Sequence, residues 1–168
     1  IGNTKGLAFD VAGACAGYLL GLSAADSFLC MGKAKRALVI GAETISSILD
    51  MEARTTCVLF GDGAGAVILE AVEAKDNPKD RGLMGVDRES DGRHFDILHT
   101  DGGPSLTGDT GHIRMVGQEV FKHAVTKLAK SAETTLEKYN ISPDELDWLI
   151  PHQANARIIE GMRRKLDM

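Results

Sequence analysis

The sequence predicts an α/β fold, and three stretches of the chain carry that prediction. Residues 37–43 (ALVIGAE) form a short continuous apolar run, which is typical of a strand covered on both faces. Residues 16–31 are small or apolar with almost no charge, and they are long enough for several helical turns. Residues 117–139 carry apolar side chains three and four positions apart, which indicates an amphipathic helix.

The other elements of the first half follow in order along the chain. Residues 7–11 have the pattern of a short apolar strand, and Gly32 is expected to end the helix that comes after them. Together with residues 37–43 they predict a βαβ unit, in which the two strands are parallel. Two β-branched runs then flank the glycine-rich residues 61–65, a pattern that predicts a hairpin or a tight corner.

The second half begins with its least regular part. Residues 73–111 are rich in Asp, Gly and other polar residues, and they predict loops and a flap over a site, with one strand at 83–88. After the long helix, residues 140–147 predict a turn, 148–151 a short strand and 153–166 a last helix. The side chains of this last helix that we expect to face inward are Ile158, Ile159, Met162 and Leu166.

Composition narrows the class of protein. Of the 168 residues, 43% are hydrophobic and 26% charged, which is typical of a soluble globular protein. No stretch approaches the roughly 20 apolar residues that cross a bilayer, so we predict no membrane partner. The net charge of −5 predicts no nucleic-acid partner. An odd number of cysteines, three, favours a reducing and cytoplasmic setting over a disulfide framework.

The two ends of the sequence predict an internal fragment of a longer chain. The chain begins at Ile1 without a methionine and passes directly into a turn that feeds an apolar run. It stops at Met168, directly after a helical pattern.

Cys15 lies between two alanines at the point where the first strand pattern gives way to the helix. The unpaired N–H groups at a helix start favour a thiolate, which is the nucleophilic form of cysteine. Small neighbours such as Ala14 and Gly17 would let other groups approach it closely. The alternative is that Cys15 is an inert core residue, and for Cys30 and Cys57 we prefer that interpretation.

His152 follows the predicted strand and Pro151, in what the pattern indicates is the first turn of the last helix. A helix start disfavours imidazolium, so we expect a neutral ring that donates a hydrogen bond to a developing oxyanion. A capping or core histidine is the alternative. Cys15 and His152 occupy equivalent positions in two similar strand–break–helix layouts, so we predict a pseudo-duplicated fold that brings them together.

Four stretches together resemble β-ketoacyl-acyl carrier protein synthase III of the thiolase-like condensing-enzyme superfamily: FDVAGACAGYLLGLSAAD, LFGDGAGAVIL, VGQEVFKHAV and DWLIPHQANARII. The resemblance runs over essentially the whole chain. It implies an incomplete layered αβαβα fold, with residues 1–75 from the N-terminal half and residues 76–168 from the C-terminal half. It also implies initiation of fatty-acid synthesis, by a decarboxylating Claisen condensation of an acyl-CoA with malonyl-acyl carrier protein.

In this family a cysteine takes the acyl group, and a histidine steadies the malonyl thioester oxygen. The resemblance assigns these catalytic roles to Cys15 and His152. It assigns acyl-CoA binding to Arg54, Gly117, Phe121, Asn155 and Arg157. It assigns carrier-protein docking to Lys122, Arg157, Arg164 and Lys165. For any single basic residue, a solvated charged face is the alternative.

The resemblance further implies a homodimer and no permanently bound cofactor, since acyl-CoA is a substrate. We predict no metal site, because His94, His99 and His112 lie among aspartates at no metal-ligand spacing. The family completes its catalytic set with an asparagine in a His-Gly-Asn-Thr segment beyond the last helix, and the sequence stops before that point. We therefore expect the chain alone to be nearly inactive in the full condensation.

Two other functions stay open from the sequence. One is a related condensing enzyme, such as a polyketide or quinolone starter synthase that uses another acyl-CoA. The other is a non-catalytic remnant that only dimerises or binds carrier protein. A cysteine hydrolase is less favoured, because hydrolysis needs water at the acyl-enzyme and an apolar tunnel excludes it.

Overall fold

The computed structural model describes residues 2, 4–73 and 81–168, which divide into two compact units. One unit consists of residues 1–42 and 63–88, and the other of residues 43–62 and 89–168. None of the helices in the described ranges has the length and apolarity that a membrane span requires. The halves expected from the sequence, divided between residues 75 and 76, stay a prediction.

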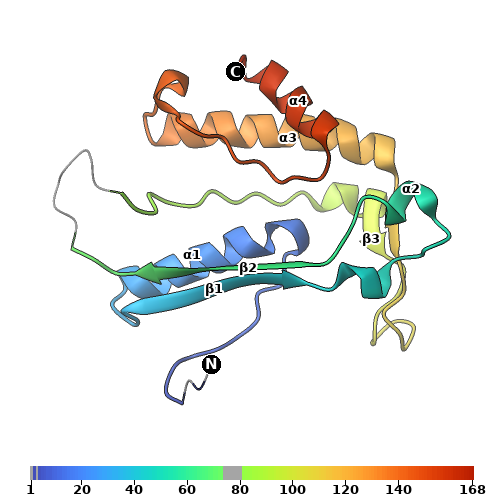
Figure 1. Ribbon diagram of the computed structural model, residues 1–168, viewed down its shortest axis with the longest axis horizontal. Helices are drawn as coiled ribbons and strands as arrows, with labels where there is room; N and C mark the ends of the chain where they lie inside the picture. Colours follow the sequence, from blue (N-terminus) through green and yellow to red (C-terminus); the bar gives the residue numbers. More distant parts are fainter. Residues whose placement is uncertain (1, 3, 74–80) are drawn as a thin grey trace. The chain divides into compact units, whose positions relative to one another are not determined.

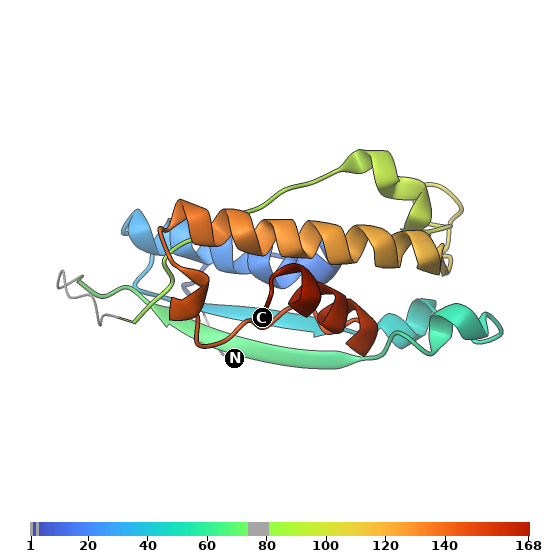
Figure 2. The ribbon, with the colours of Figure 1, turned by 90° about the horizontal axis from the view of Figure 1, so that it is seen from above.

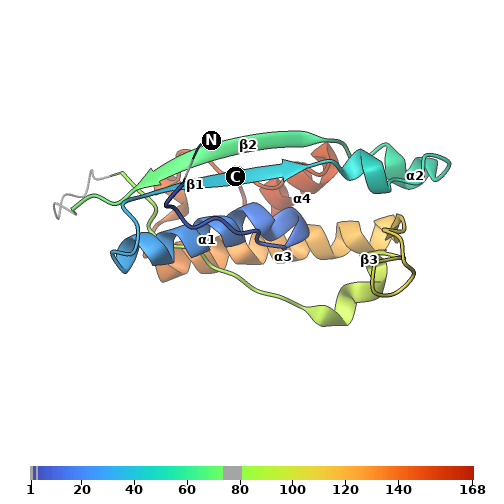
Figure 3. The ribbon, with the colours of Figure 1, turned by 90° about the horizontal axis from the view of Figure 1, so that it is seen from below.

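The first unit consists of a helix and a two-stranded sheet. Strands β1 (Arg36–Glu43) and β2 (Gly63–Glu70) pair with each other and run in opposite directions (Figure 1). An ion pair joins Arg36 Nε to Glu70 Oε1 at 2.8 Å, so the start of one strand lies beside the end of the other. Helix α1 (Gly17–Cys30) lies along the sheet (Figure 3), where a Cβ placed on Gly21 would come 3.2 Å from Val39 Cγ1.

Helix α1 confirms the helix that was predicted after residue 16, and Gly32 ends it as expected. Gly32 has a φ of +67°, a conformation that glycine adopts without steric cost. Its N–H donates to the Leu29 carbonyl at 3.0 Å, and the Lys33 N–H donates to the Phe28 carbonyl at 2.9 Å. These two bonds form a Schellman motif, which satisfies carbonyls that the end of a helix leaves free.

The predicted βαβ unit is wrong. Residues 7–13 are irregular, and Leu7 and Phe9 are exposed. A strand needs a neighbour for its N–H and C=O groups, and no described strand pairs with this run. The strand at 37–43 is confirmed as β1, but only Val39 in it is buried, so it is not covered on both faces.

The predicted turn at residues 61–65 is also wrong, because Gly63 and Gly65 lie inside β2. The run before this glycine-rich stretch is not a strand either. Its first two residues end the short helix α2 (Arg54–Cys57), in which Thr56 is buried, and the rest forms a turn. The paired strands β1 and β2 are therefore joined by residues 44–62 rather than by a tight hairpin.

The second unit is built around two packed helices. Helices α3 (Gly117–Lys138) and α4 (Ala156–Lys165) lie beside each other in Figures 1 and 2, which confirms both predicted helices. Ile158 and Met162 of α4 are each only 3% exposed, as the inward-facing pattern predicts, whereas Ile159 and Leu166 are half-buried. The other elements of this unit are η2 (Ile45–Ile48), α2, η3 (Gly92–Ile97), β3 (Leu98–Thr100), β4 (Ile113–Met115) and η4 (Pro143–Glu145).

Strands predicted at residues 83–88 and 148–151 are not formed. Trp148 and Ile150 are 81% and 80% exposed, so this apolar run is not buried, and it forms no strand. The predicted irregular segment 73–111 is mostly irregular, apart from η3 and β3, and residues 74–80 lie outside the described residues. The turn at 140–147 is confirmed and contains η4, where the Ser142 N–H donates to Glu145 Oε2 at 2.9 Å in a capping box.

Gly161 sets how closely α3 and α4 approach. A Cβ at this position would lie 2.8 Å from Val125 Cγ2, and valine has little rotamer freedom in a helix with which to move away. We expect Gly161→Ala to lower the free energy of unfolding by about 1–3 kcal/mol. Thermal unfolding followed by circular dichroism measures this.

The control for this prediction is Gly117→Ala at the start of α3, where the new Cβ would make ordinary contact with Met115 Cε at 3.7 Å. Adding Val125→Ala should recover part of the stability that Gly161→Ala loses. Equal midpoints of thermal unfolding for Gly161→Ala and Gly117→Ala would show that the contact between Gly161 and Val125 does not set the distance between α3 and α4.

Candidate functional site

Cys15 lies in a tight turn that leads directly into α1. It is the middle residue of η1 (Ala14–Ala16), and its side chain is exposed. Ala14 has a φ of +44°, in the left-handed region that favours glycine, and the small alanine side chain limits the strain. A Cβ on Gly13 would clash with the Leu20 side chain and come 3.1 Å from Gly17 Cα. The small residues therefore let the chain turn sharply and present the thiol at the beginning of a helix.

The other two cysteines are not the buried core residues that the sequence suggested. Cys30 is exposed and its thiol contacts Asp26 Oδ1 at 3.6 Å. The negative charge of Asp26 raises the pKa of Cys30, with smaller contributions from burial and from this hydrogen bond, so Cys30 is less nucleophilic at neutral pH. Cys57 is half-buried, and its thiol faces the Met51 carbonyl at 3.8 Å.

His152 does not lie in a helix, and the prediction that it does is wrong. It is exposed in the irregular segment before α4, which begins at Ala156. Asn155 sets this start, because its Oδ1 accepts the Ile158 N–H at 3.1 Å as an N-cap. His152 therefore precedes the helix by four residues, and the helix-start argument for its neutral form does not apply at this distance. Its catalytic role stays a prediction.

Three of the residues that the sequence assigned to binding meet in one cavity. A cavity of about 450 Å³, which we call the α3–α4 pocket, is lined by Phe121, Ala156, Arg157, Glu160, Gly161 and Arg164. Phe121 is 39% exposed and supplies an aromatic wall from α3, while the arginines come from α4. No hydrogen bond or ion pair within the described part of the chain engages Arg157. The pocket thus combines an apolar surface with an unengaged cation.

Glu160 is a pocket residue that the sequence argument missed, although its spacing to Arg164 is a recognisable helix ion-pair pattern. Its Oε1 accepts from Arg164 Nε at 2.9 Å, and its Oε2 accepts from Arg163 Nε at 2.9 Å. The hydrogen bonds from Arg163 first, and then Arg164, lower the pKa of Glu160 to about 2. Part of the positive charge of α4 is therefore balanced within the helix.

The low pKa of Glu160 predicts how stability depends on pH. A carboxylate whose pKa is lower in the folded than in the unfolded chain stabilises the fold above the unfolded value, which is about 4.3 for Glu. That contribution is lost as the pH falls from about 4.3 toward 2. We expect wild type to unfold at a higher temperature than Glu160→Gln above pH 5, with the difference shrinking as the pH falls and vanishing below about pH 2. A constant difference in midpoint across this range would contradict the ion pairs.

The remaining predicted residues lie at element ends or on exposed faces. Arg54 is the first residue of α2 and is exposed, and Gly117 is the first residue of α3. Lys122 and Lys165 are exposed on α3 and α4. The residues placed together in the α3–α4 pocket are therefore Phe121, Arg157 and Arg164.

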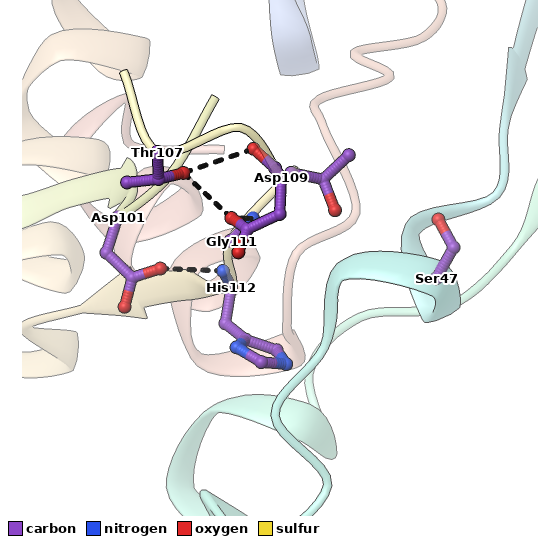
Figure 4. Close-up of a pocket in the computed structure, with 7 residues that line it drawn as sticks. Ser47, Asp101, Thr107, Asp109, Gly111 and His112 are labelled. Atoms are coloured by element: carbon purple, nitrogen blue, oxygen red, sulfur yellow. Dashed lines mark hydrogen bonds between the residues drawn. The ribbon is translucent and has the colours of Figure 1, made fainter. Parts of the chain in front are cut away.

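A second cavity, of about 440 Å³, lies between the loop that joins β3 to β4 and the segment that carries Ser47 (Figure 4). The two carboxylates that line it, Asp101 and Asp109, accept hydrogen bonds from residues of the β3–β4 loop. Asp109 Oδ1 accepts from the Thr107 hydroxyl at 2.8 Å and from the Gly111 N–H at 3.0 Å. Asp101 Oδ1 accepts from the His112 N–H at 2.7 Å. These bonds order the loop, and none of the predicted site residues lines the cavity.

Sequence reasoning also missed Arg114, which contacts two aspartates in the second unit. Its Nη1 lies 3.0 Å from Asp50 Oδ2, and its Nε donates to Asp101 Oδ2. Asp50 and Arg114 are 64 residues apart, so no local spacing could have indicated the contact.

Comparisons with known proteins agree on one family. The family model described as 3-oxoacyl-[acyl-carrier-protein (ACP)] synthase III matches residues 9–92, and the C-terminal model of the same synthase matches residues 136–168. The β-ketoacyl-[acyl-carrier-protein] synthase III of Ruegeria pomeroyi is 54% identical over 168 residues, which are 100% of this chain and 52% of the relative. The chain therefore spans about half the length of such curated relatives.

Solved structures give the same result. The 3-oxoacyl-[acyl-carrier-protein] synthase III of Aquifex aeolicus matches with a TM-score of 0.83 and 42% identity, over 95% of this chain and 48% of that one. The priming β-ketosynthase of the R1128 polyketide pathway matches with a TM-score of 0.79 and 31% identity, over 91% of this chain and 46% of that one. The thiolase-like fold class is thereby confirmed. The chain belongs to the 3-oxoacyl-[acyl-carrier-protein] synthase III family.

Proposed function

We propose that this chain supplies the nucleophile and one hydrogen-bond donor, Cys15 and His152, to the acyl-cysteine and decarboxylation chemistry of a 3-oxoacyl-acyl carrier protein synthase III. The Cys15 thiolate attacks the carbonyl of an acyl-CoA, most simply acetyl-CoA, and CoA leaves as its thiolate, which takes a proton from water. Malonyl-acyl carrier protein then loses carbon dioxide, and His152 donates a hydrogen bond to the thioester oxygen on which the enolate charge develops. The new carbanion attacks the acyl-Cys15 carbonyl, and Cys15 leaves to release 3-oxoacyl-carrier protein.

The α3–α4 pocket is the observation that carries this proposal. The resemblance implies acyl-CoA binding for Phe121 and Arg157, and carrier-protein docking for Arg157 and Arg164. One cavity contains all three. An aromatic wall beside an unengaged guanidinium suits a ligand with an apolar arm and a phosphate group, because Arg binds phosphate oxygens through paired donors. Acyl-CoA and a malonyl-carrier protein both present such an arm.

Affinity for these two ligands tests the proposal. We expect Arg157→Ala to weaken the binding of CoA and of malonyl-carrier protein about fivefold to tenfold at low salt, and the difference to shrink as salt rises. Arg93→Ala is the control, because Arg93 is also exposed but is engaged by Asp91 at 2.8 Å. Equal losses for the two variants would show that the pocket is not the binding site.

A polyketide starter synthase is the second candidate, because the R1128 priming enzyme matches this chain over 91% of its length. The reaction would be the same and the starter acyl group would differ. Acylation rates with acetyl-, butyryl- and longer acyl-CoA distinguish the two, since a fatty-acid initiator should prefer the shortest. We also propose a homodimer in the cytoplasm that uses acyl-CoA as substrate and keeps no permanent cofactor.

A further inference from the structure

Arg114 joins two segments that are far apart in the sequence. It lies in the middle of β4, and its guanidinium contacts Asp50 from the segment before α2 and Asp101, the residue directly after β3. We call these three residues the Arg114 bridge. Arginine suits this position because its planar group presents donors in fixed directions, so that it can hold two carboxylates at once.

The Asp101 side of the bridge is rigid. Strands β3 and β4 are antiparallel, with Thr100 opposite Ile113, and Ile113 is buried. Beyond this pair, the Asp101 N–H donates to the His112 carbonyl at 3.0 Å, and Asp101 Oδ1 accepts the His112 N–H at 2.7 Å. Both carboxylate oxygens of Asp101 are therefore engaged, one by the backbone and one by Arg114. Hence the Arg114 side chain has a fixed direction, and α3 begins at Gly117, three residues later.

The Asp50 side organises the approach to α2. Asp50 Oδ1 accepts the Glu52 N–H at 3.1 Å, and the Asp50 carbonyl accepts the Ala53 N–H at 3.1 Å. These bonds form the turn that leads into Arg54, the first residue of α2. Arg114 holds the other oxygen, Oδ2, and its hydrogen bond is the largest cause that lowers the pKa of Asp50. The bridge thus ends one turn before Arg54.

Stability alone explains the bridge poorly. The three side chains are 29% to 43% exposed, and exposed ion pairs contribute little to folding free energy because water screens them. Orientation is a better explanation, because both ends of the bridge are already fixed by backbone hydrogen bonds. Because Arg114 is bonded to both ordered turns, it fixes the position of one turn relative to the other.

We propose that Arg114 is a positioning residue, which sets Arg54 at the start of α2 relative to Gly117 and Phe121 on α3. This inference rests on the proposed function, together with the acyl-CoA-binding roles that the resemblance implies for Arg54, Gly117 and Phe121. Arg114 does not need to touch the ligand. It keeps the two binding segments at the separation that CoA requires, so that binding does not first have to order α2.

The test measures the dissociation constant of CoA by calorimetry on the 168-residue chain. Arg114→Gln is expected to raise it about tenfold. Asp50→Asn should raise the dissociation constant by a similar factor. The double variant Asp50→Asn/Arg114→Gln should bind CoA no more weakly than Arg114→Gln alone, because both substitutions remove the same bridge. Arg93→Gln is the matched control, since it removes a pair with Asp91 of similar length, 2.8 Å and 2.9 Å, between residues only two apart.

Amide hydrogen exchange without CoA gives a second measurement. The N–H groups of Ala53, Thr56 and Cys57 are bonded within the turn and α2. We expect their exchange to be at least about tenfold faster in Arg114→Gln and unchanged in Arg93→Gln. Weaker CoA binding with unchanged exchange would overturn a positioning role, because Arg114 would then act by direct contact.

The remaining outcomes separate this inference from the proposed function. If the wild-type chain binds no CoA, the proposed function is wrong and the positioning role falls with it. If Arg54→Ala binds CoA as wild type does, the positioning role alone is overturned, because Arg54 then takes no part in the CoA site. If Arg54→Ala weakens binding but Arg114→Gln behaves as Arg93→Gln does, the proposed function stands and the inference about Arg114 is overturned.

Discussion

Incubated with acetyl-CoA, the chain is expected to gain one acetyl group, and to gain it on Cys15. The thiol is exposed in the turn that leads directly into α1, so an acyl-CoA can reach it. Cys15→Ala should lower the rate of acetylation by more than about a thousandfold, because no other group replaces the nucleophile. Mass spectrometry of the intact chain and of its peptides measures both the rate and the position.

Cys30→Ala is the matched control for this prediction, since Cys30 is exposed too but lies beside Asp26. It should be acetylated as wild type is. Acetyl groups on Cys30 or Cys57 would show that the nucleophile has been assigned to the wrong residue. A chain that takes no acetyl group at all would favour the non-catalytic remnant that the sequence left open.

His152→Ala should slow the loss of carbon dioxide from malonyl-carrier protein by about a hundredfold to a thousandfold. The enolate oxygen gains charge in the transition state, and removing one of its hydrogen-bond donors removes that stabilisation. Release of carbon dioxide from labelled malonyl-carrier protein is the measurement. His152→Gln keeps an N–H donor and should retain more activity than His152→Ala.

The control here is His112→Ala, another exposed histidine of the same unit, which lines the cavity of Figure 4. It should leave the rate unchanged. Acetylation of Cys15 should also be unaffected in His152→Ala, since the histidine acts after the acyl group has been transferred. A parallel loss of both activities would point instead to a structural role for His152.

The three longer helices were predictable from the sequence, whereas α2 and most of the strands were not. Helices α1, α3 and α4 follow from spacing within one segment, because helical hydrogen bonds are local. A strand is completed only by a partner, and residues 7–11 and 148–151 have the composition of strands without a described neighbour to pair with. Glycine usually signals a turn, but Gly63 and Gly65 lie within β2, so composition alone was misleading there.

The candidate site shows the same division between local and distant information. Phe121, Arg157 and Arg164 were singled out by the resemblance, and α3 and α4 place them around one cavity. The helix start at Asn155 was missed by two to three residues, because an N-cap depends on one side-chain hydrogen bond rather than on periodicity. The contact between Arg114 and Asp50 was beyond any local pattern, because it exists only after the chain has folded.

The β1–β2 sheet has a practical consequence at the bench. In the part of the chain that the structure describes, each strand is paired along one side only, and Ile40 and Ile68 are more than half exposed. Two-stranded sheets have marginal stability in water, and an open apolar strand edge readily recruits further strands from other molecules. Concentrating the purified chain should therefore produce β-rich aggregates before it produces crystals. A lysine in place of Ile68 would be the first substitution to try for a well-behaved sample.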